Sequence, residues 1–119
     1  MLESLPLELT YADKNDRVKF FTESKFSKGF VRIKTILGRR LLFCHPPRLE
    51  GMVKVNVERL KKGEEFKEYW TRQGNRIIKV IIAAIKDKKE EYLGTLEIVE
   101  DLTEVVTNPE AVMKKIMVL

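Results

Sequence analysis

Apolar and polar residues alternate with a period of two near the start of the chain, which is the pattern of a half-buried β-strand. The alternation runs over residues 5–11, stops at a polar turn from Asp13 to Asp16, and resumes over residues 18–21. Two short alternating stretches joined by a polar turn predict a β-hairpin.

A second pair of strands is predicted in the middle of the chain. Residues 65–72 form the first, Gln73-Gly74-Asn75 is a turn sequence, and residues 76–86 form a strand that is apolar on both faces. Such a strand has to be covered on both sides. We expect one side to meet the domain's own helices and the other to meet a terminal helix or a second subunit.

Helical periodicity marks two further segments, whereas residues 22–38 show no clear period and are expected to form loops and short helical turns. Residues 48–61 predict a helix that ends before Gly63. Asn108-Pro109-Glu110 is typical of a helix start. The face of the first helix that should pack on the sheet consists of Leu49, Met52, Val53, Asn56 and Leu60.

The segment from Lys86 to Glu104 combines a charged turn with a last strand. Tyr92, Leu96, Ile98 and Leu102 recur at even spacing and are expected on one side of that strand. Gly94 within it predicts a bulge or a close approach of another group to the backbone. Asp101 is expected to end the strand by accepting hydrogen bonds from the next amides, with Glu104 completing a capping-box-like pattern.

The last strand and the tetrapeptide Cys44-His45-Pro46-Pro47 resemble the PAS domains found at the end of bacterial and archaeal proteins that also carry hemerythrin-like domains. The resemblance covers roughly Leu5 to Val105. Together with the patterns above it predicts an α+β fold, a PAS-like five-stranded antiparallel sheet with helices on one face, plus a C-terminal helix. The expected division is a sensor domain over residues 3–105 and a helix for packing or signal relay over residues 106–119.

Composition fits a single globular domain, since 44% of the 119 residues are apolar and 34% are charged. The longest mostly apolar run, residues 80–85, is too short to span a bilayer, and residues 1–4 lack the basic region followed by an apolar one that is typical of a signal peptide. The single cysteine, Cys44, is compatible with a reducing compartment. These features predict a cytoplasmic protein without membrane contact.

In PAS domains, as the resemblance implies, a pocket between the inner face of the sheet and the helices can hold a small ligand or cofactor. The candidates for lining it are apolar or aromatic residues and the one histidine, and the alternative is that they form plain core: Phe43, His45, Met52, Trp70, Ile81 and Leu96.

His45 and Cys44 are the two residues that can ligate a soft metal or a haem iron. The alternative is structural, with His45 orienting the helix start and Cys44 packing as a small hydrophobe. Two such ligands are too few for a structural zinc site. The cofactor is therefore unknown, and haem or another small planar ligand stays open.

A basic segment lies between Glu23 and Glu50, where no acidic residue occurs. It can bind phosphates of a nucleic acid, a nucleotide or an acidic partner, or it can be a solvated loop surface. Its anion-binding candidates are Arg32, Lys34, Arg39, Arg40 and Arg48.

The sequence does not predict an enzyme, because it has no phosphate-binding glycine loop, no metal-ligand motif and only one histidine to act as a base. It predicts a sensory and signal-transduction domain, dimeric, that binds a small ligand and relays the signal to a partner protein. A ligand-free protein interaction module and an anion or nucleic-acid binder are the alternatives.

Overall fold

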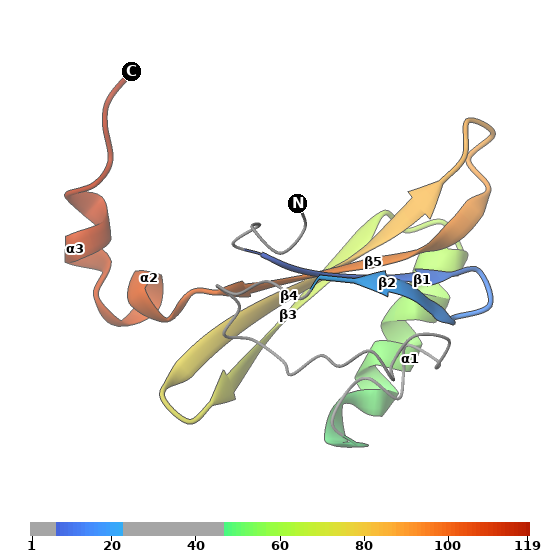
Figure 1. Cartoon of the computed structure of the whole chain (residues 1–119), viewed down its shortest axis with the longest axis horizontal. Coiled ribbons are helices and arrows are strands. Elements are labelled where there is room, and N and C mark those ends of the chain that lie inside the picture. Colours follow the sequence, from blue (N-terminus) through green and yellow to red (C-terminus); the bar gives the residue numbers. More distant parts are fainter. Residues whose placement is uncertain (1–6, 23–46) are drawn as a thin grey trace.

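The computed structural model describes residues 7–22 and 47–119. Five strands form one antiparallel sheet in the order β2-β1-β5-β4-β3. Figure 1 shows helix α1 on one face of this sheet and the two short helices α2 and α3 beyond its end. The elements are β1 (Glu8–Asp13), β2 (Val18–Phe21), α1 (Pro47–Lys61), β3 (Phe66–Gln73), β4 (Arg76–Lys86), β5 (Tyr92–Asp101), α2 (Thr103–Thr107) and α3 (Pro109–Met113). The predicted α+β fold with a five-stranded antiparallel sheet is confirmed.

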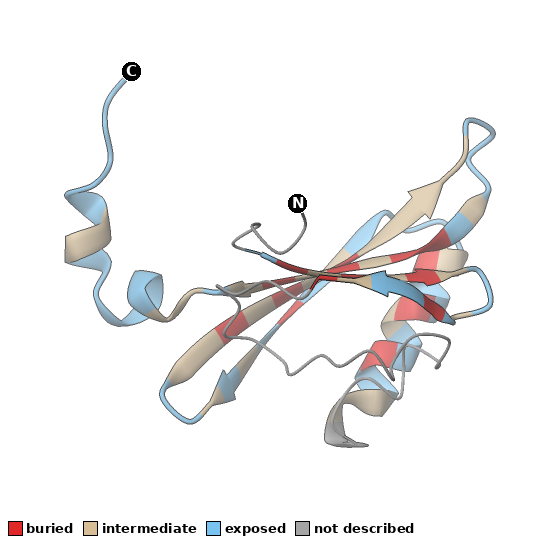
Figure 2. Ribbon diagram, viewed as in Figure 1, coloured by how far each residue is buried: buried red, intermediate tan, exposed pale blue. Residues whose placement is uncertain are grey.

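The core lies between α1 and the face of the sheet that it covers, which we call the inner face (Figure 2). From α1 it takes Val53, Val57 and Leu60, which recur at helical spacing. From the sheet it takes mainly alternate residues of β4 and a residue of each neighbouring strand: Ile78, Val80, Ile82, Val99 and Tyr69. Met52, predicted on the packing face of this helix, lies at its margin instead and is 36% exposed.

The end of α1 follows from Gly63, as the sequence predicts. The amide of Gly63 donates to the Leu60 carbonyl and the amide of Glu64 to the Arg59 carbonyl, which is the pairing of a Schellman motif. Gly63 has φ +115, a value that side chains disfavour. The chain therefore reverses at this point into β3.

Two hairpin loops, the predicted turns after Asp13 and after Lys86, are built alike. In each, an aspartate, Asp13 or Asp87, accepts hydrogen bonds from the amides two and four residues later. The residue three positions after the aspartate, Asp16 or Glu90, has φ 63 or 64. The side chain of one aspartate thus holds each loop in a conformation that would otherwise favour glycine.

The C-terminal segment differs in part from the prediction. Asn108 caps α3 as expected, its side chain accepting from the Ala111 amide, and Pro109 lies in the first turn. The helix ends at Met113, however, so the expected longer helix to Leu119 is wrong. Ile116 and Leu119 are exposed, and without burial of an apolar stripe a short helix gains little stability from its neighbours.

Candidate functional site

The inner face carries buried polar residues on the central strand β5 and on its neighbour β1. Thr95 and Glu97 of β5 and Glu8 and Thr10 of β1 are all buried, and Glu97 is only 1% exposed. The antiparallel register places Thr10 directly opposite Glu97. Hydrogen-bonding side chains therefore lie on the same face as the apolar core residues of β4 and β5.

Two carboxylates in such surroundings are costly unless donors or opposite charges face them, because burial removes them from water. Glu8 and Glu97 each have an interaction partner. This part of the core is therefore polar, and its buried polar groups have partners.

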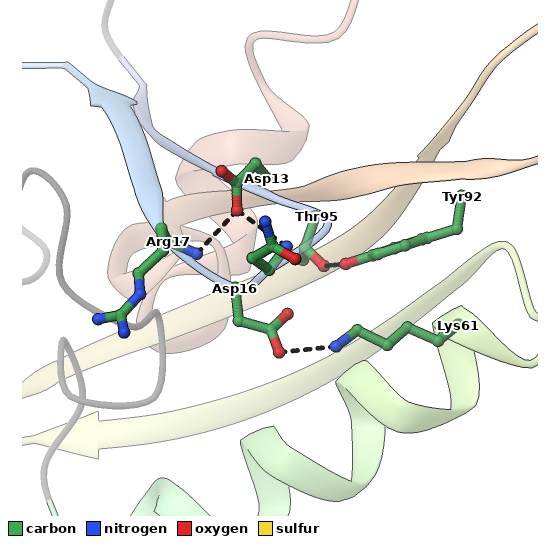
Figure 3. A network of polar contacts seen from close by, with 7 residues as sticks. Asp13, Asp16, Arg17, Lys61, Tyr92 and Thr95 are labelled. Carbon is green, nitrogen blue, oxygen red and sulfur yellow. Dashed lines mark hydrogen bonds and ion pairs between the residues drawn. The ribbon is translucent and has the colours of Figure 1, made fainter.

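A polar network closes one end of this face, where the β1–β2 turn meets the last turn of α1 (Figure 3). The Lys61 ammonium lies 2.6 Å from a carboxylate oxygen of Asp16 and 5.9 Å from the centre of the Tyr92 ring. The Tyr92 hydroxyl and the Thr95 hydroxyl share a hydrogen bond of 2.5 Å. This network ties α1 to β1, β2 and β5.

The surroundings of the network shift the pKa values of two of its groups, Lys61 and Tyr92. Burial disfavours the charged form of Lys61, but the hydrogen bond and the charge of Asp16 outweigh it, so the pKa of Lys61 is raised. Burial also raises the pKa of the Tyr92 phenol, although the hydrogen bond with Thr95 acts in the opposite direction. Both groups therefore keep their protons at neutral pH.

At the other end of β5, Asp101 fixes the path by which the chain leaves the sheet. One oxygen of its carboxylate accepts from the Thr103 amide at 3.0 Å and from the Thr103 hydroxyl at 2.5 Å. The other oxygen pairs with Arg76 at 3.3 Å. The Thr103 hydroxyl in turn accepts from the Ile77 amide of β4. We call this set of contacts the exit junction.

The exit junction also affects the acidity of Asp101. Partial burial acts to raise its pKa, but the hydrogen bonds from Thr103 and the neighbouring Arg76 guanidinium outweigh this, so the pKa of Asp101 is lowered. The predicted role of Asp101 in ending the strand is confirmed. Glu104, expected to complete the cap, instead pairs with Lys115 at 2.7 Å.

Three pocket candidates from the sequence lie on the opposite side of the sheet, which we call the outer face. Trp70, Ile81 and Leu96 alternate with the buried residues of their strands and therefore point away from α1. Trp70 is 51% exposed. The expectation that these three residues line the space between sheet and helices is wrong.

Leu96 was predicted on the wrong side because β5 carries apolar residues on its outer side and polar residues on its inner side. Leu96 and Ile98 suggested that the even positions face the core, whereas the structure buries Thr95, Glu97 and Val99. Tyr92 nevertheless packs on the inner side, because the register shifts between Tyr92 and Gly94. A bulge of this kind reverses the side to which later residues point.

The remaining candidates lie largely outside the described residues. Phe43, Cys44, His45, Arg32, Lys34, Arg39 and Arg40 are among these, and Arg48 belongs to α1 without a described side chain. Within residues 7–22 and 47–119, no group of three or more His, Cys, Asp or Glu side chains is placed to hold a metal ion.

The strand order 2-1-5-4-3 with a helix packed on one face defines a PAS-like α+β domain. A family model described as "PAS domain" matches residues 1–103. The chain therefore belongs to the PAS domain family. None of the curated proteins compared with it matches.

Solved structures share this fold. A C-terminal domain from Streptococcus mutans is 27% identical, with a TM-score of 0.74 over 94% of this chain and 84% of that one. A sensory box sensor histidine kinase from Vibrio cholerae is 15% identical, with a TM-score of 0.63 over 84% and 85% of the two chains. A PAS domain from Colwellia psychrerythraea is 14% identical, with a TM-score of 0.64 over 87% and 92%.

Family membership supports a sensory or signalling role. Among the helices of the described segments, none is both long and apolar enough to cross a membrane.

Proposed function

We propose that this PAS domain is a sensory module that binds a small ligand at the inner face of β1 and β5 and relays occupancy through the exit junction to α2 and α3. The proposal is based on strand β5, because the same strand contributes to the proposed ligand site and to the exit junction. Its middle bears the buried Thr95 and Glu97, and its end bears Asp101. One rigid strand thus joins a recognition surface to the C-terminal helices.

The polar residues of the inner face support a proposal for the class of ligand. Glu8, Thr10, Thr95 and Glu97 already have partners, so a ligand with hydrogen-bond donors, such as an amine, amide or nucleobase edge, would bind here by replacing one of those partners. The sequence leaves haem or another small planar ligand open, and a planar ligand with polar edges agrees with both lines of reasoning. We further propose that the domain acts by binding alone and catalyses no reaction.

Native mass spectrometry of the purified chain, before and after denaturation, tests ligand binding. We expect a small mass that is released on unfolding, and we expect Glu97→Gln to lose it while keeping the circular dichroism spectrum of the wild type. Glu100→Gln is the matched control, because it changes a glutamate of the same strand that alternates to the outer face. Equal retention of the mass by both variants would reject the inner face as the site.

The relay has its own test. Amide chemical shifts of residues 102–113 should move when the released compound is added back to the ligand-free protein, and should move less in Asp101→Ala, in which the carboxylate that holds Thr103 is absent. Shifts confined to β1 and β5 would show a binding domain without this route of relay.

A ligand-free interaction module is the second candidate function. It is favoured by the exposed apolar residues of the C-terminal segment, among them Val105, Val106, Met113 and Ile116. A protein that carries no releasable mass, and whose C-terminal segment is needed to retain a signalling partner, would support this alternative.

Membership of the hemerythrin-associated subtype and a cytoplasmic location stay predictions.

Binding of anions or nucleic acid through the basic segment stays a prediction as well, because the side chains of its candidate residues are outside what the structure describes. Steep salt dependence of binding to a DNA or RNA oligonucleotide, lost on Arg39→Glu and Arg40→Glu, would support it.

A further inference from the structure

Strand β3 forms one edge of the sheet, since it pairs with β4 alone. It is eight residues long, contains no proline and pairs with β4 without a register shift. The strand at the opposite edge, β2, has only four residues and lies beside a bulge in its pairing with β1. Short strands and bulges protect an edge from further pairing, whereas a long and regular edge strand is a template for another strand. The edge at β3 is therefore the one that can accept a further strand.

The hairpin that joins β3 to β4 determines which backbone groups of β3 face outward. Gln73 and Arg76 are paired across a two-residue turn, and the Ala84 amide donates to the Glu65 carbonyl at 2.8 Å. In an antiparallel pair, every second residue exchanges hydrogen bonds with the neighbouring strand. Glu65 and Gln73 belong to this set, so the residues between its members direct their amides and carbonyls away from β4. These outward-facing residues are Phe66, Glu68, Trp70 and Arg72.

No strand of the described segments pairs with the outward-facing residues on their free side. Their side chains are exposed as well, with Phe66 at 61% and Trp70 at 51%. Both the backbone groups and the side chains of this edge are therefore available to a partner in an extended conformation.

The side chains of the outward-facing residues define the sequence that fits beside them. In antiparallel pairing, each of them lies directly opposite one residue of the added strand, on the same face of the sheet. Phe66 and Trp70 favour apolar residues at these positions. Glu68 already pairs with Lys79 at 3.5 Å, whereas Arg72 forms no ion pair within the described part of the chain. An acidic residue opposite Arg72 would supply the missing charge.

A second copy of β3 fits this pattern less well than a different sequence does. The antiparallel register that uses all the outward-facing residues places Phe66 opposite Arg72 and Glu68 opposite Trp70. It leaves Arg72 without an acidic residue across from it. The homodimer expected from the sequence therefore stays a prediction that this edge does not explain.

We propose that an extended segment of a partner protein binds along β3 as a sixth, antiparallel strand. Main-chain hydrogen bonds to the outward-facing residues supply the affinity, and the side chains opposite them supply the specificity. The segment has an acidic residue opposite Arg72 and apolar residues two and six positions later, opposite Trp70 and Phe66. This site lies at the edge of the sheet and not on the inner face of β1 and β5, so it does not depend on the ligand site proposed above.

Amide hydrogen exchange of the full chain, followed by NMR, tests the proposal. The probe is a synthetic seven-residue peptide with blocked ends that has aspartate at its first position, valine at its third and seventh, and threonine elsewhere. In the free protein, the amides of residues 67, 69 and 71 should exchange slowly because they bond to β4, and those of residues 66, 68, 70 and 72 should exchange fast. Added peptide should slow the second set alone, by a factor of one plus the ratio of peptide concentration to the dissociation constant.

Glu68→Pro and Glu68→Ala form a matched pair of variants. Proline removes an amide that faces away from β4, a position at which an edge strand tolerates it. Alanine removes the same carboxylate and keeps the amide. Only Glu68→Pro should abolish the effect of the peptide on the amides of residues 70 and 72, and urea denaturation shows whether both variants are folded.

Arg72→Glu tests the specificity without changing the backbone. It should weaken binding of the aspartate peptide by about 10-fold, because a favourable cross-strand pair becomes a repulsive one. A peptide with lysine in place of the aspartate should restore the affinity. Arg59→Glu is the control, since it makes the same charge change at an exposed residue of α1 and should alter the affinity for neither peptide.

Unchanged exchange of the wild type at millimolar peptide would overturn the proposal, and so would equal binding by Glu68→Pro and Glu68→Ala. Exchange at residues 66, 68, 70 and 72 that is slow without peptide and becomes fast on dilution would also overturn it, because a second copy would then occupy the edge.

Discussion

Replacing Gly94 by alanine tests the packing of β1 against β5. A Cβ at Gly94 would collide with the Ala12 carbonyl oxygen, and it would lie 2.7 Å from the Tyr11 hydroxyl and 2.8 Å from a carbon of the Tyr11 ring. The Tyr11 ring can rotate away, but the Ala12 oxygen is backbone. Ala12 and Asp13 are paired with Thr95 and Gly94 in the sheet, so the oxygen cannot move without disturbing that pairing.

The expected loss of stability depends on the fact that the closest neighbour is a backbone atom rather than a side chain. Adding a methyl group to a tightly packed site typically costs about 1–3 kcal/mol. Because a backbone atom is the closest neighbour, we expect the upper end, a loss of about 3 kcal/mol of unfolding free energy. Urea denaturation followed by circular dichroism measures this, and with a denaturant slope near 1.5 kcal/mol/M the midpoint should fall by about 2 M.

Gly51→Ala is the matched control. Gly51 lies within α1, with nothing within 4 Å of its Cβ position. Alanine favours the helix over glycine by about 0.8–1 kcal/mol, so this variant should be more stable than the wild type. All proteins should be compared at one concentration, because any self-association would also change the measured stability. A Gly94→Ala variant that unfolds at the wild-type midpoint would refute the close approach.

Further predictions concern single contacts. Glu90→Gly removes a side chain at φ 64 and should raise the unfolding free energy by about 0.5–1 kcal/mol, and an unchanged melting temperature would contradict this. A double-mutant cycle of Lys61→Met and Asp16→Asn should give a coupling of about 0.5–1 kcal/mol. Because the pKa of Lys61 is raised on folding, this coupling is present below the usual lysine pKa of 10.5 and is lost as the pH rises beyond it. Asp101→Asn should cost about 1 kcal/mol at pH 7. The lowered pKa of Asp101 means that its contribution is present above the usual value of 3.8 and is lost at lower pH, so acid titration of unfolding should converge for variant and wild type.

The elements of the fold could be predicted because their signals are local. Gly63 and Asn108 marked a helix end and a helix start, and both act through hydrogen bonds within a few residues. The turns after Asp13 and at Gly74 were predictable for the same reason, since an aspartate side chain or a positive φ determines each of them. Gly94 was expected to mark a bulge or a close approach, and the structure confirms both.

Which side of β5 faces the core could not be predicted from the residues of β5 alone. A period of two separates the sides of a strand but does not say which side is buried. Leu96 and Ile98 are apolar, so the sequence pattern assigns their side to the core, whereas the fold buries Glu97. Deciding between the sides requires knowing where α1 packs, which is tertiary information. The same limit applied to Trp70 and Ile81.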